Sequence, residues 1–309
     1  MSEKDLALKF QQVINKASEI VLDKKQQITL VLTCLLAQGH LLIEDEPGVG
    51  KTTLAQTIAK LVGLKQSRIQ FTNDLLPSDI IGQSIFNRND SSFVFKKGPL
   101  FSEIVIADEL NRANPKTQSA LLQAMEEGEV STDQETIALP ESFFLIATQN
   151  PKNQIGTYPL PESQVDRFLM SLHLDYISEN SEIQIFLGEN PRQKIDRLTH
   201  IISQTELTQS QLLIQKIHLE EKIATYIARL LSYTRQHQSE YHPLSTRTGL
   251  ALVSAAKASA FLNGRNFVIP DDIYNIIKPV LSHRLAQQDG LPFGEKQVEK
   301  LLQKNPIPN

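Results

Sequence analysis

Short apolar runs alternate with helix-length segments through the first half of the chain. Five-residue runs bounded by polar or turn residues are typical of buried strands. They occur at 40–44 (HLLIE), 67–71 (SRIQF), 103–107 (EIVIA), 143–147 (FFLIA) and 170–174 (MSLHL). Between them, 28–38 is an apolar helix-length run, and 115–127 has Pro115 at a helical first turn. This alternation predicts an α/β fold, a mainly parallel sheet sandwiched by helices.

Two segments interrupt this alternation. Residues 83–98 pair two apolar pieces about the polar turn NRND, and 129–139 does the same about Asp133 and Gln134. Both patterns predict hairpins inserted into the core. A decorative surface loop is the alternative for each of them.

The pattern changes after Asp175, where strand-like runs nearly stop. Segments 219–237 and 246–262 have the i, i+3, i+4 spacing of amphipathic helices, and Pro270 and Asp271 mark another helix start. The pattern predicts two domains, a core over 1–177 that contains both hairpins and an all-helical domain over 178–309.

Composition narrows the class of protein. The chain has 309 residues, 40% hydrophobic and 21% charged, which is ordinary for a folded globular protein. The formal net charge is −4, with 16 Lys+Arg against 22 Asp+Glu in residues 1–175 and 15 against 13 in the rest. Neither part has the basic face that nucleic-acid binders usually show, so no nucleic acid is expected as a partner.

Other compositional signals concern location and metal chemistry. Cys34 is the only cysteine and lies in an apolar run, so we predict a buried thiol, no intramolecular disulfide and no cysteine-based metal site. The segment MSEKDLALKF lacks the basic-then-apolar order of a signal peptide, and no run of about 18 uncharged apolar residues is present. These features predict a cytoplasmic protein without a membrane segment.

The stretch LLIEDEPGVGKTT, residues 41–53, has the order of a phosphate-binding loop between a strand and a helix. Asp45 stands where the pattern G-x-x-x-x-G-K-S/T has its first glycine. That glycine chiefly shapes the start of the turn, so a short turn-forming residue can replace it. Lys51 would reach the β- and γ-phosphates, and the Thr52 hydroxyl would ligate Mg²⁺. The predicted nucleotide-binding residues are Pro47, Gly48, Val49, Gly50, Lys51, Thr52 and Thr53.

A second element is the apolar strand IVIADE, which ends in Asp108 and Glu109. The carboxyl edge of a parallel sheet would bring both carboxylates beside the phosphate loop. There Asp108 could hold Mg²⁺ through water, and Glu109 could orient and deprotonate the attacking water. A lone acidic strand end also serves as a helix cap, but its place after a phosphate loop favours catalysis.

Three further residues are candidates for the γ-phosphate. Asn150 ends the strand of IATQNP, Arg167 follows in LPESQVDRF, and Arg247 lies in LSTRTGLAL. Taken singly, the asparagine is typical of a turn and each arginine of a solvated ion pair. In this order they indicate phosphoryl transfer, which needs positive charge on the developing transition state.

Together these segments resemble the MoxR family of AAA+ ATPases over nearly the whole chain. The most specific stretch is ADELNRANPKTQSALLQAMEEGEV, supported by TNDLLPSDIIG, FKKGPLF, GTYPLPESQVDRF, SYTR, TRTGLALVSAAKA and LSHRL. The resemblance implies a P-loop AAA+ core, a helical lid and a ring, usually of six subunits. It also implies frequent partners that carry a von Willebrand factor A domain.

The resemblance assigns roles residue by residue. Lys51 and Thr52 look like the Walker A contacts, and Asp108 and Glu109 like the Walker B pair. Asn150 looks like sensor 1, Arg167 like the arginine finger offered to the neighbouring subunit, and Arg247 like sensor 2. The two hairpins match the helix-2 insert and the pre-sensor-1 insert, which point toward the pore or the partner face of the ring.

Two departures from the family pattern bear on these roles. Residues 21–23 read Val-Leu-Asp where relatives commonly have Val-Gly-Gln, which leaves the adenine-side contacts there open. The lid arginine follows Ser-Thr instead of Ser-Pro. Asp45 is frequent within the family.

The leading hypothesis is a Mg²⁺-dependent ATPase ring that remodels or matures protein partners, including insertion of cofactors or metals. One alternative is a chelatase-like motor subunit that drives metal insertion into a porphyrin. Another is a nucleotide-gated adaptor that binds ATP with negligible turnover, although Glu109 and Arg167 argue against it. A DNA motor of the same branch has no support from the charge count.

Overall fold

The structure is a computed structural model of the chain. It describes residues 3–46, 48–88, 91–132, 135–149, 156–188, 190–286 and 290–307.

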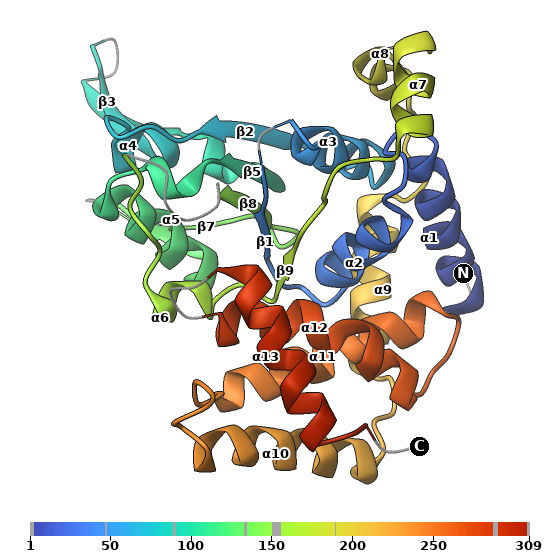
Figure 1. The fold of residues 1–309 in the computed structure, drawn as a ribbon. Helices are drawn as coiled ribbons and strands as arrows, with labels where there is room; N and C mark the ends of the chain where they lie inside the picture. Colours follow the sequence, from blue (N-terminus) through green and yellow to red (C-terminus); the bar gives the residue numbers. More distant parts are fainter. Residues whose placement is uncertain are drawn as a thin grey trace.

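A parallel sheet forms the centre of the molecule (Figure 1). Among the described residues it has five strands in the order β2-β5-β8-β1-β9. Their bounds are β1 Leu41–Glu44, β2 Gln66–Gln70, β5 Ile104–Asp108, β8 Phe144–Gln149 and β9 Met170–Leu172. β1, β5, β8 and β9 are buried throughout, as expected for strands covered on both faces. The first and last residues of all five strands lie within two residues of the ends predicted from the sequence.

Helices cover both faces of this sheet. Leu41 and Ile43 join a core with α1 (Glu3–Ser18), α2 (Lys25–Leu36) and α3 (Lys51–Leu61). Leu42 points the other way, into a second core with α5 (Pro115–Glu127), because successive strand residues face opposite sides. The predicted α/β sandwich is therefore confirmed.

α5 begins and ends where its sequence signals place it. The Asn114 side chain accepts hydrogen bonds from the backbone N–H groups of Lys116 and Thr117, and Pro115 occupies the first turn. Gly128 ends the helix in the left-handed conformation at φ 68°.

Two antiparallel pairs stand outside the central sheet, in the two segments where hairpins are predicted. β3 (Gly82–Asn87) pairs with β4 (Ser92–Lys97) and projects at the upper left of Figure 1, after the short helix α4 (Pro77–Ile81). β6 (Glu129–Ser131) pairs with β7 (Thr136–Ala138). A Cβ on Gly82 would lie 2.1 Å from the Lys96 carbonyl oxygen, so the base of the first pair needs glycine.

The rest of the chain is helical. The only strand-like pairing after β9 in the described part of the chain is an isolated bridge between His218 and Phe267. None of the described helices is long and apolar enough to span a bilayer. The remaining elements are α6 Glu162–Val165, α7 Glu179–Leu187, α8 Pro191–Asp196, α9 Gln204–Gln215, α10 Glu221–Gln236, α11 Thr246–Leu262, α12 Pro270–Leu285, α13 Leu291–Lys304 and the 3₁₀ turns Pro99–Phe101 and Leu110–Arg112.

The helical region packs directly on the core. Phe10 of α1 meets Phe261 of α11 edge to face, with ring centroids 6.0 Å apart. The buried Arg284 of α12 pairs with Asp166, Nε to Oδ1 at 2.6 Å, and also donates to the carbonyl oxygen of Phe168 at 2.8 Å. These bonds fix the segment between α6 and β9, which carries Arg167.

His40, at the start of β1, makes stability sensitive to acid. The Leu145 N–H donates to His40 Nδ1 at 3.1 Å, which requires an unprotonated Nδ1, and burial lowers the pKa of His40 to about 4. The unfolded value is about 6.5. We therefore expect the free energy of unfolding to be intact above about pH 6.5 and to fall as pH drops toward 4, by at most about 1.4 kcal/mol per pH unit for this one proton.

Chemical denaturation between pH 7 and pH 4 measures this loss. Burial also lowers the pKa of His283, so some pH dependence should persist when His40 is replaced. A His40→Asn variant should show a clearly shallower slope than the unmodified chain. Equal slopes would contradict the role of His40.

Candidate functional site

The phosphate loop connects the end of β1 to the start of α3. Gly48 and Gly50 have φ of 91° and 93°, a region that side chains disfavour, although a Cβ at either would meet no atom within 4 Å. Glycine is thus needed at both positions because of the positive φ, and not because a side chain would collide with neighbouring atoms. Gly50 is also the N-cap of α3, so the unpaired N–H groups of the first helical turn face the loop.

Lys51 and Thr52 lie beside the carboxylate of Asp108. Lys51 Nζ donates to the carbonyl oxygen of Asp45 at 2.8 Å, and Thr52 Oγ1 donates to Asp108 Oδ2 at 3.5 Å. Burial lowers the pKa of Lys51, while the surrounding carboxylates, Asp45 and Asp108 foremost, oppose that shift. The Thr148 hydroxyl of β8 donates a hydrogen bond to the other carboxylate oxygen of Asp108, Oδ1, at 3.2 Å. The structure thus brings together Lys51, Thr52 and Asp108.

Glu109 occupies a strained backbone position next to this cluster. Its φ of 56° is left-handed, a conformation that costs a non-glycine residue about 1–3 kcal/mol and often marks functional sites. Its Oε2 accepts from Gln70 Nε2 at 2.9 Å and pairs with Arg112 Nε at 3.0 Å. The Glu109 N–H donates to Thr148 Oγ1 at 3.0 Å. Two side chains therefore hold the carboxylate by the same oxygen.

Arg68 of β2 forms an ion pair that the motif analysis did not include. Its Nε lies 2.5 Å from Asp108 Oδ2, the same oxygen that faces Thr52. Arg68 and Gln70 are two residues apart on one strand, so they share a face and reach Asp108 and Glu109 respectively. The sequence signal that could have identified Arg68 and Gln70 is the alternation of polar residues in QSRIQ, the strand that pairs with β5.

Arg167 and Arg247 meet at a different place. Glu126, in the last turn of α5, accepts from Arg167 Nε at 2.8 Å and also pairs with Arg247. The Arg167 side chain is 27% exposed and that of Arg247 51%. The structure thus brings the two predicted arginines together, Arg167 from the segment after α6 and Arg247 from α11, joined by a glutamate that the sequence did not single out.

These arginines lie at the opposite edge of the sheet from Lys51. β1 and β9 are parallel and Leu41 pairs with Met170, so Arg167, just before β9, lies at the amino edge. Lys51 follows the carboxyl end of β1, and four residues of strand separate the two edges by about 13 Å. Two predicted residues, Pro47 and Asn150, fall outside the described residues.

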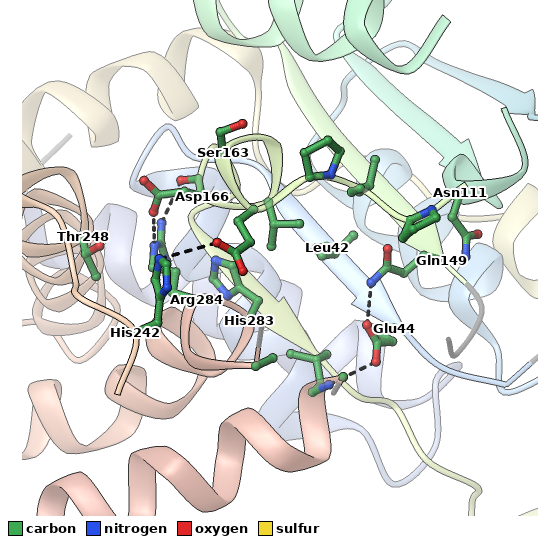
Figure 2. A pocket seen from close by; sticks show the side chains of 18 of the residues that line it. Leu42, Glu44, Asn111, Gln149, Ser163, Asp166, His242, Thr248, His283 and Arg284 are labelled. Carbon is green, nitrogen blue, oxygen red and sulfur yellow. Dashed lines mark hydrogen bonds and ion pairs between the residues drawn. The ribbon is translucent and has the colours of Figure 1, made fainter. Parts of the chain in front are cut away.

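A separate cavity of about 1040 Å³ lies between the sheet and the helical region (Figure 2). Its main polar side chains already have partners. Glu44 is bonded to Gln149 and to the Leu291 N–H, and Asp166 to Arg284. Leu42 lines it from the sheet face opposite α3. The cavity is thus lined by both apolar and paired polar side chains, and it reaches Glu44, the residue before Asp45.

Comparison with known protein families gives two matches along the chain. Residues 40–170 match the ATPase family associated with various cellular activities (AAA). Residues 232–304 match the AAA lid domain. The first match begins one residue before β1 and ends at the first residue of β9, so it contains the other four strands of the central sheet in full.

Individual relatives align over most of their length. YeaC of Bacillus subtilis, named as an uncharacterized protein, is 41% identical over 97% of this chain and 94% of its own. Chaperone MoxR1 of Mycobacterium tuberculosis is 36% identical over 89% and 75%. Among solved structures, a candidate ATPase from Cytophaga hutchinsonii superimposes with a TM-score of 0.87 and 36% identity, covering 99% of this chain and 97% of that one.

Proposed function

Because the chain belongs to the MoxR family of AAA+ ATPases, we propose that it binds ATP with Mg²⁺ at the phosphate loop and hydrolyses it in a ring assembly. The observation that carries this proposal is the cluster of Lys51, Thr52, Asp108 and Glu109 at one edge of the sheet. The N–H groups at the start of α3 and the Lys51 ammonium would hold the phosphates.

The residues beside the loop fit a magnesium ion. Mg²⁺ prefers oxygen ligands and is commonly held by one or two protein groups together with phosphates and water. The Thr52 hydroxyl and the Asp108 carboxylate are such a pair, with their oxygens 3.5 Å apart. An ion held there by Thr52 and Asp108 would offset the negative charge of the nucleotide phosphates.

Arg68 competes for the same oxygen of Asp108. We expect Arg68→Ala to lower the Mg²⁺ concentration needed for half-maximal strengthening of ADP binding. The Arg68 side chain is half-exposed, so the ion pair is worth up to about 1 kcal/mol, equivalent to about fivefold. Titrating Mg²⁺ against a fluorescent ADP analogue measures the midpoint without any turnover.

Arg68→Lys should keep the midpoint close to that of the unmodified chain, and Arg229→Ala on the exposed face of α10 is the matched arginine control. A higher Mg²⁺ midpoint in Arg68→Ala would mean that the guanidinium orients Asp108 as a ligand and does not compete.

Glu109 is the proposed base for the attacking water. Its carboxylate is held by Gln70 and Arg112. Both donors bind the same oxygen, so for Oε2 to accept a proton from water the carboxylate would have to leave at least one of them. The left-handed backbone of Glu109 supports this view, since a strained position is one that a rearrangement can relax.

Arg167 and Arg247 are proposed to act on the nucleotide of a neighbouring subunit. Within one chain the sheet separates them from Lys51, as described above. A head-to-tail interface brings one edge of a subunit against a different edge of the next and closes into a ring. Glu126 would hold both arginines until a neighbour's phosphate replaces it. Asn150 is proposed as sensor 1.

The work done by hydrolysis is proposed to be remodelling or maturation of a protein partner, including insertion of a cofactor or metal. The name of the relative MoxR1 supports a chaperone role. A hexameric ring, a cytoplasmic location and a separate partner with a von Willebrand factor A domain complete the proposal, together with the division into a core over 1–177 and a lid over 178–309.

Binding and turnover measured on one sample test this function. ATP binding followed by a fluorescent analogue, with phosphate release that requires Mg²⁺, would support an ATPase. Tight binding without phosphate release in an assembled sample would indicate a nucleotide-gated adaptor instead.

A further inference from the structure

Asp45 is a buried carboxylate at the first position of the phosphate loop. Its side chain is well placed to join two segments, because Oδ2 accepts from the Leu174 N–H at 2.5 Å and from the Asp175 N–H at 2.9 Å. Its Oδ1 accepts from the Glu46 N–H at 2.9 Å. Asp45 has no positive φ, so the position does not need the glycine of the usual pattern. An aspartate here ties the loop to the segment after β9.

This tie also explains why β9 is shorter than the sequence predicts. The predicted strand reached Leu174, but β9 ends at Leu172. The Leu174 N–H donates to the Asp45 side chain in place of a strand neighbour. Asp175 then takes a left-handed conformation with φ 55°, which turns the chain away from the sheet.

The chain from Asp175 to α7 is held at further points. Lys24 Nζ donates to the carbonyl oxygen of Tyr176 at 3.1 Å. The Ser178 N–H and hydroxyl both donate to Asp23 Oδ2 at 2.8 Å. Ser178 is in turn the N-cap of α7. Side-chain hydrogen bonds therefore hold the chain at several points between the phosphate loop and the first turn of α7.

α7 stands away from the body of the molecule, at the upper right of Figure 1. Its residues Ile183, Phe186 and Leu187 share one face by helical spacing, and the last two are 77% and 85% exposed. A helix with so little buried surface takes its position from its attachments, α8 packed on α3 at one end and the segment before Ser178 at the other. The attachment before Ser178 is the segment bonded to Asp45 and Asp23.

Lys51 supplies the link to the nucleotide. Its ammonium donates to the Asp45 carbonyl oxygen in the structure, and phosphate-loop lysines turn to the β- and γ-phosphates when a nucleotide binds. Loss of that bond would free the Asp45 carbonyl oxygen, in the residue whose carboxylate accepts from the Leu174 and Asp175 N–H groups. The lysine thus has two alternative acceptors, which is the two-state element that coupling requires.

We propose that Asp45 is a positioning residue that couples nucleotide binding at the phosphate loop to the 174–178 segment and through it to α7. The proposal rests on the proposed function insofar as it requires nucleotide at this loop. It adds a role for Asp45, the one residue that departs from the usual loop pattern. In this proposal the exposed apolar face of α7 is the surface that responds to nucleotide binding.

Amide hydrogen exchange of residues 174–187, with and without Mg·ADP, tests the coupling. In the unmodified chain we expect nucleotide to change the exchange rate of this segment by about tenfold. Asp45→Gly restores the usual pattern, so we expect ADP binding to stay within about fivefold while the change at 174–187 falls below about twofold. Asp45→Asn keeps acceptor oxygen on the side chain and should retain most of the change.

A second variant tests the coupling without changing any residue of the phosphate loop. Asp23→Ala leaves the Asp45 bonds intact, so residues 174–175 should still respond to ADP while the first turn of α7 should not. ADP binding measured on the same samples reports on the proposed function separately from the exchange. A nucleotide response at 174–187 that survives in Asp45→Gly, or one that is missing from the unmodified chain once ADP is bound, would overturn the coupling.

Discussion

Replacing Arg167 by alanine should lower ATP turnover of the assembled protein by roughly 10³- to 10⁵-fold, the range found for arginine fingers. ATP binding should be nearly unchanged, since Arg167 lies at the sheet edge opposite its own phosphate loop. The physical reason is that a guanidinium stabilises the charge that develops on the transferred phosphoryl group. Phosphate release and analogue binding, measured on the same samples, separate the two effects.

Mixing subunits distinguishes a finger that acts across an interface from one that acts within a chain. Arg167→Ala subunits retain Glu109, and Glu109→Gln subunits retain Arg167, so mixed rings contain some complete sites. Turnover of the mixture should exceed that of either variant alone. Arg229→Ala, an exposed arginine of α10, should behave as the unmodified chain. No recovery in mixtures that do assemble would contradict the shared site.

Replacing Glu109 by glutamine should lower turnover by about 10²- to 10⁴-fold, the usual contribution of a general base. Glutamine has nearly the same shape but cannot accept the proton of the attacking water. The variant should therefore bind ATP and retain it unhydrolysed. Single-turnover measurement with excess protein reports the chemical step directly.

Gln70→Ala is the informative companion, because it removes one donor to Glu109 without touching the carboxylate. We expect it to keep turnover within about tenfold of the unmodified chain, since an exposed hydrogen bond contributes about 0.5–1.4 kcal/mol, equivalent to about two- to tenfold. If Glu109→Gln hydrolysed ATP at the unmodified rate, the base would have to be another group.

Much of this molecule could be predicted from short sequence patterns. Four of the five central strands, β1, β5, β8 and β9, are buried and rich in apolar residues, so short apolar runs located them, whereas β2 is mostly exposed. The predicted family and the predicted AAA+ core with its helical lid region are confirmed. Lys51, Thr52 and Asp108 came together as expected because the carboxyl ends of parallel strands share one edge.

Contacts between distant segments could not be predicted in the same way. Glu126 is one of several acidic residues in its segment, and only the packing of α11 and of the segment after α6 against α5 shows that it receives both arginines. The carboxylate of Asp45 finds its donors 129 and 130 residues along the chain. Such pairings depend on tertiary structure, which a local pattern does not encode.

The most direct test of a shared ATPase site is Mg-ATP turnover per subunit as a function of protein concentration, with sedimentation on the same samples to report assembly. If the site is completed by a neighbour, turnover per subunit should rise together with the assembled fraction and level off when assembly is complete. Turnover per subunit that stays constant while the chain goes from monomer to assembly would contradict the account.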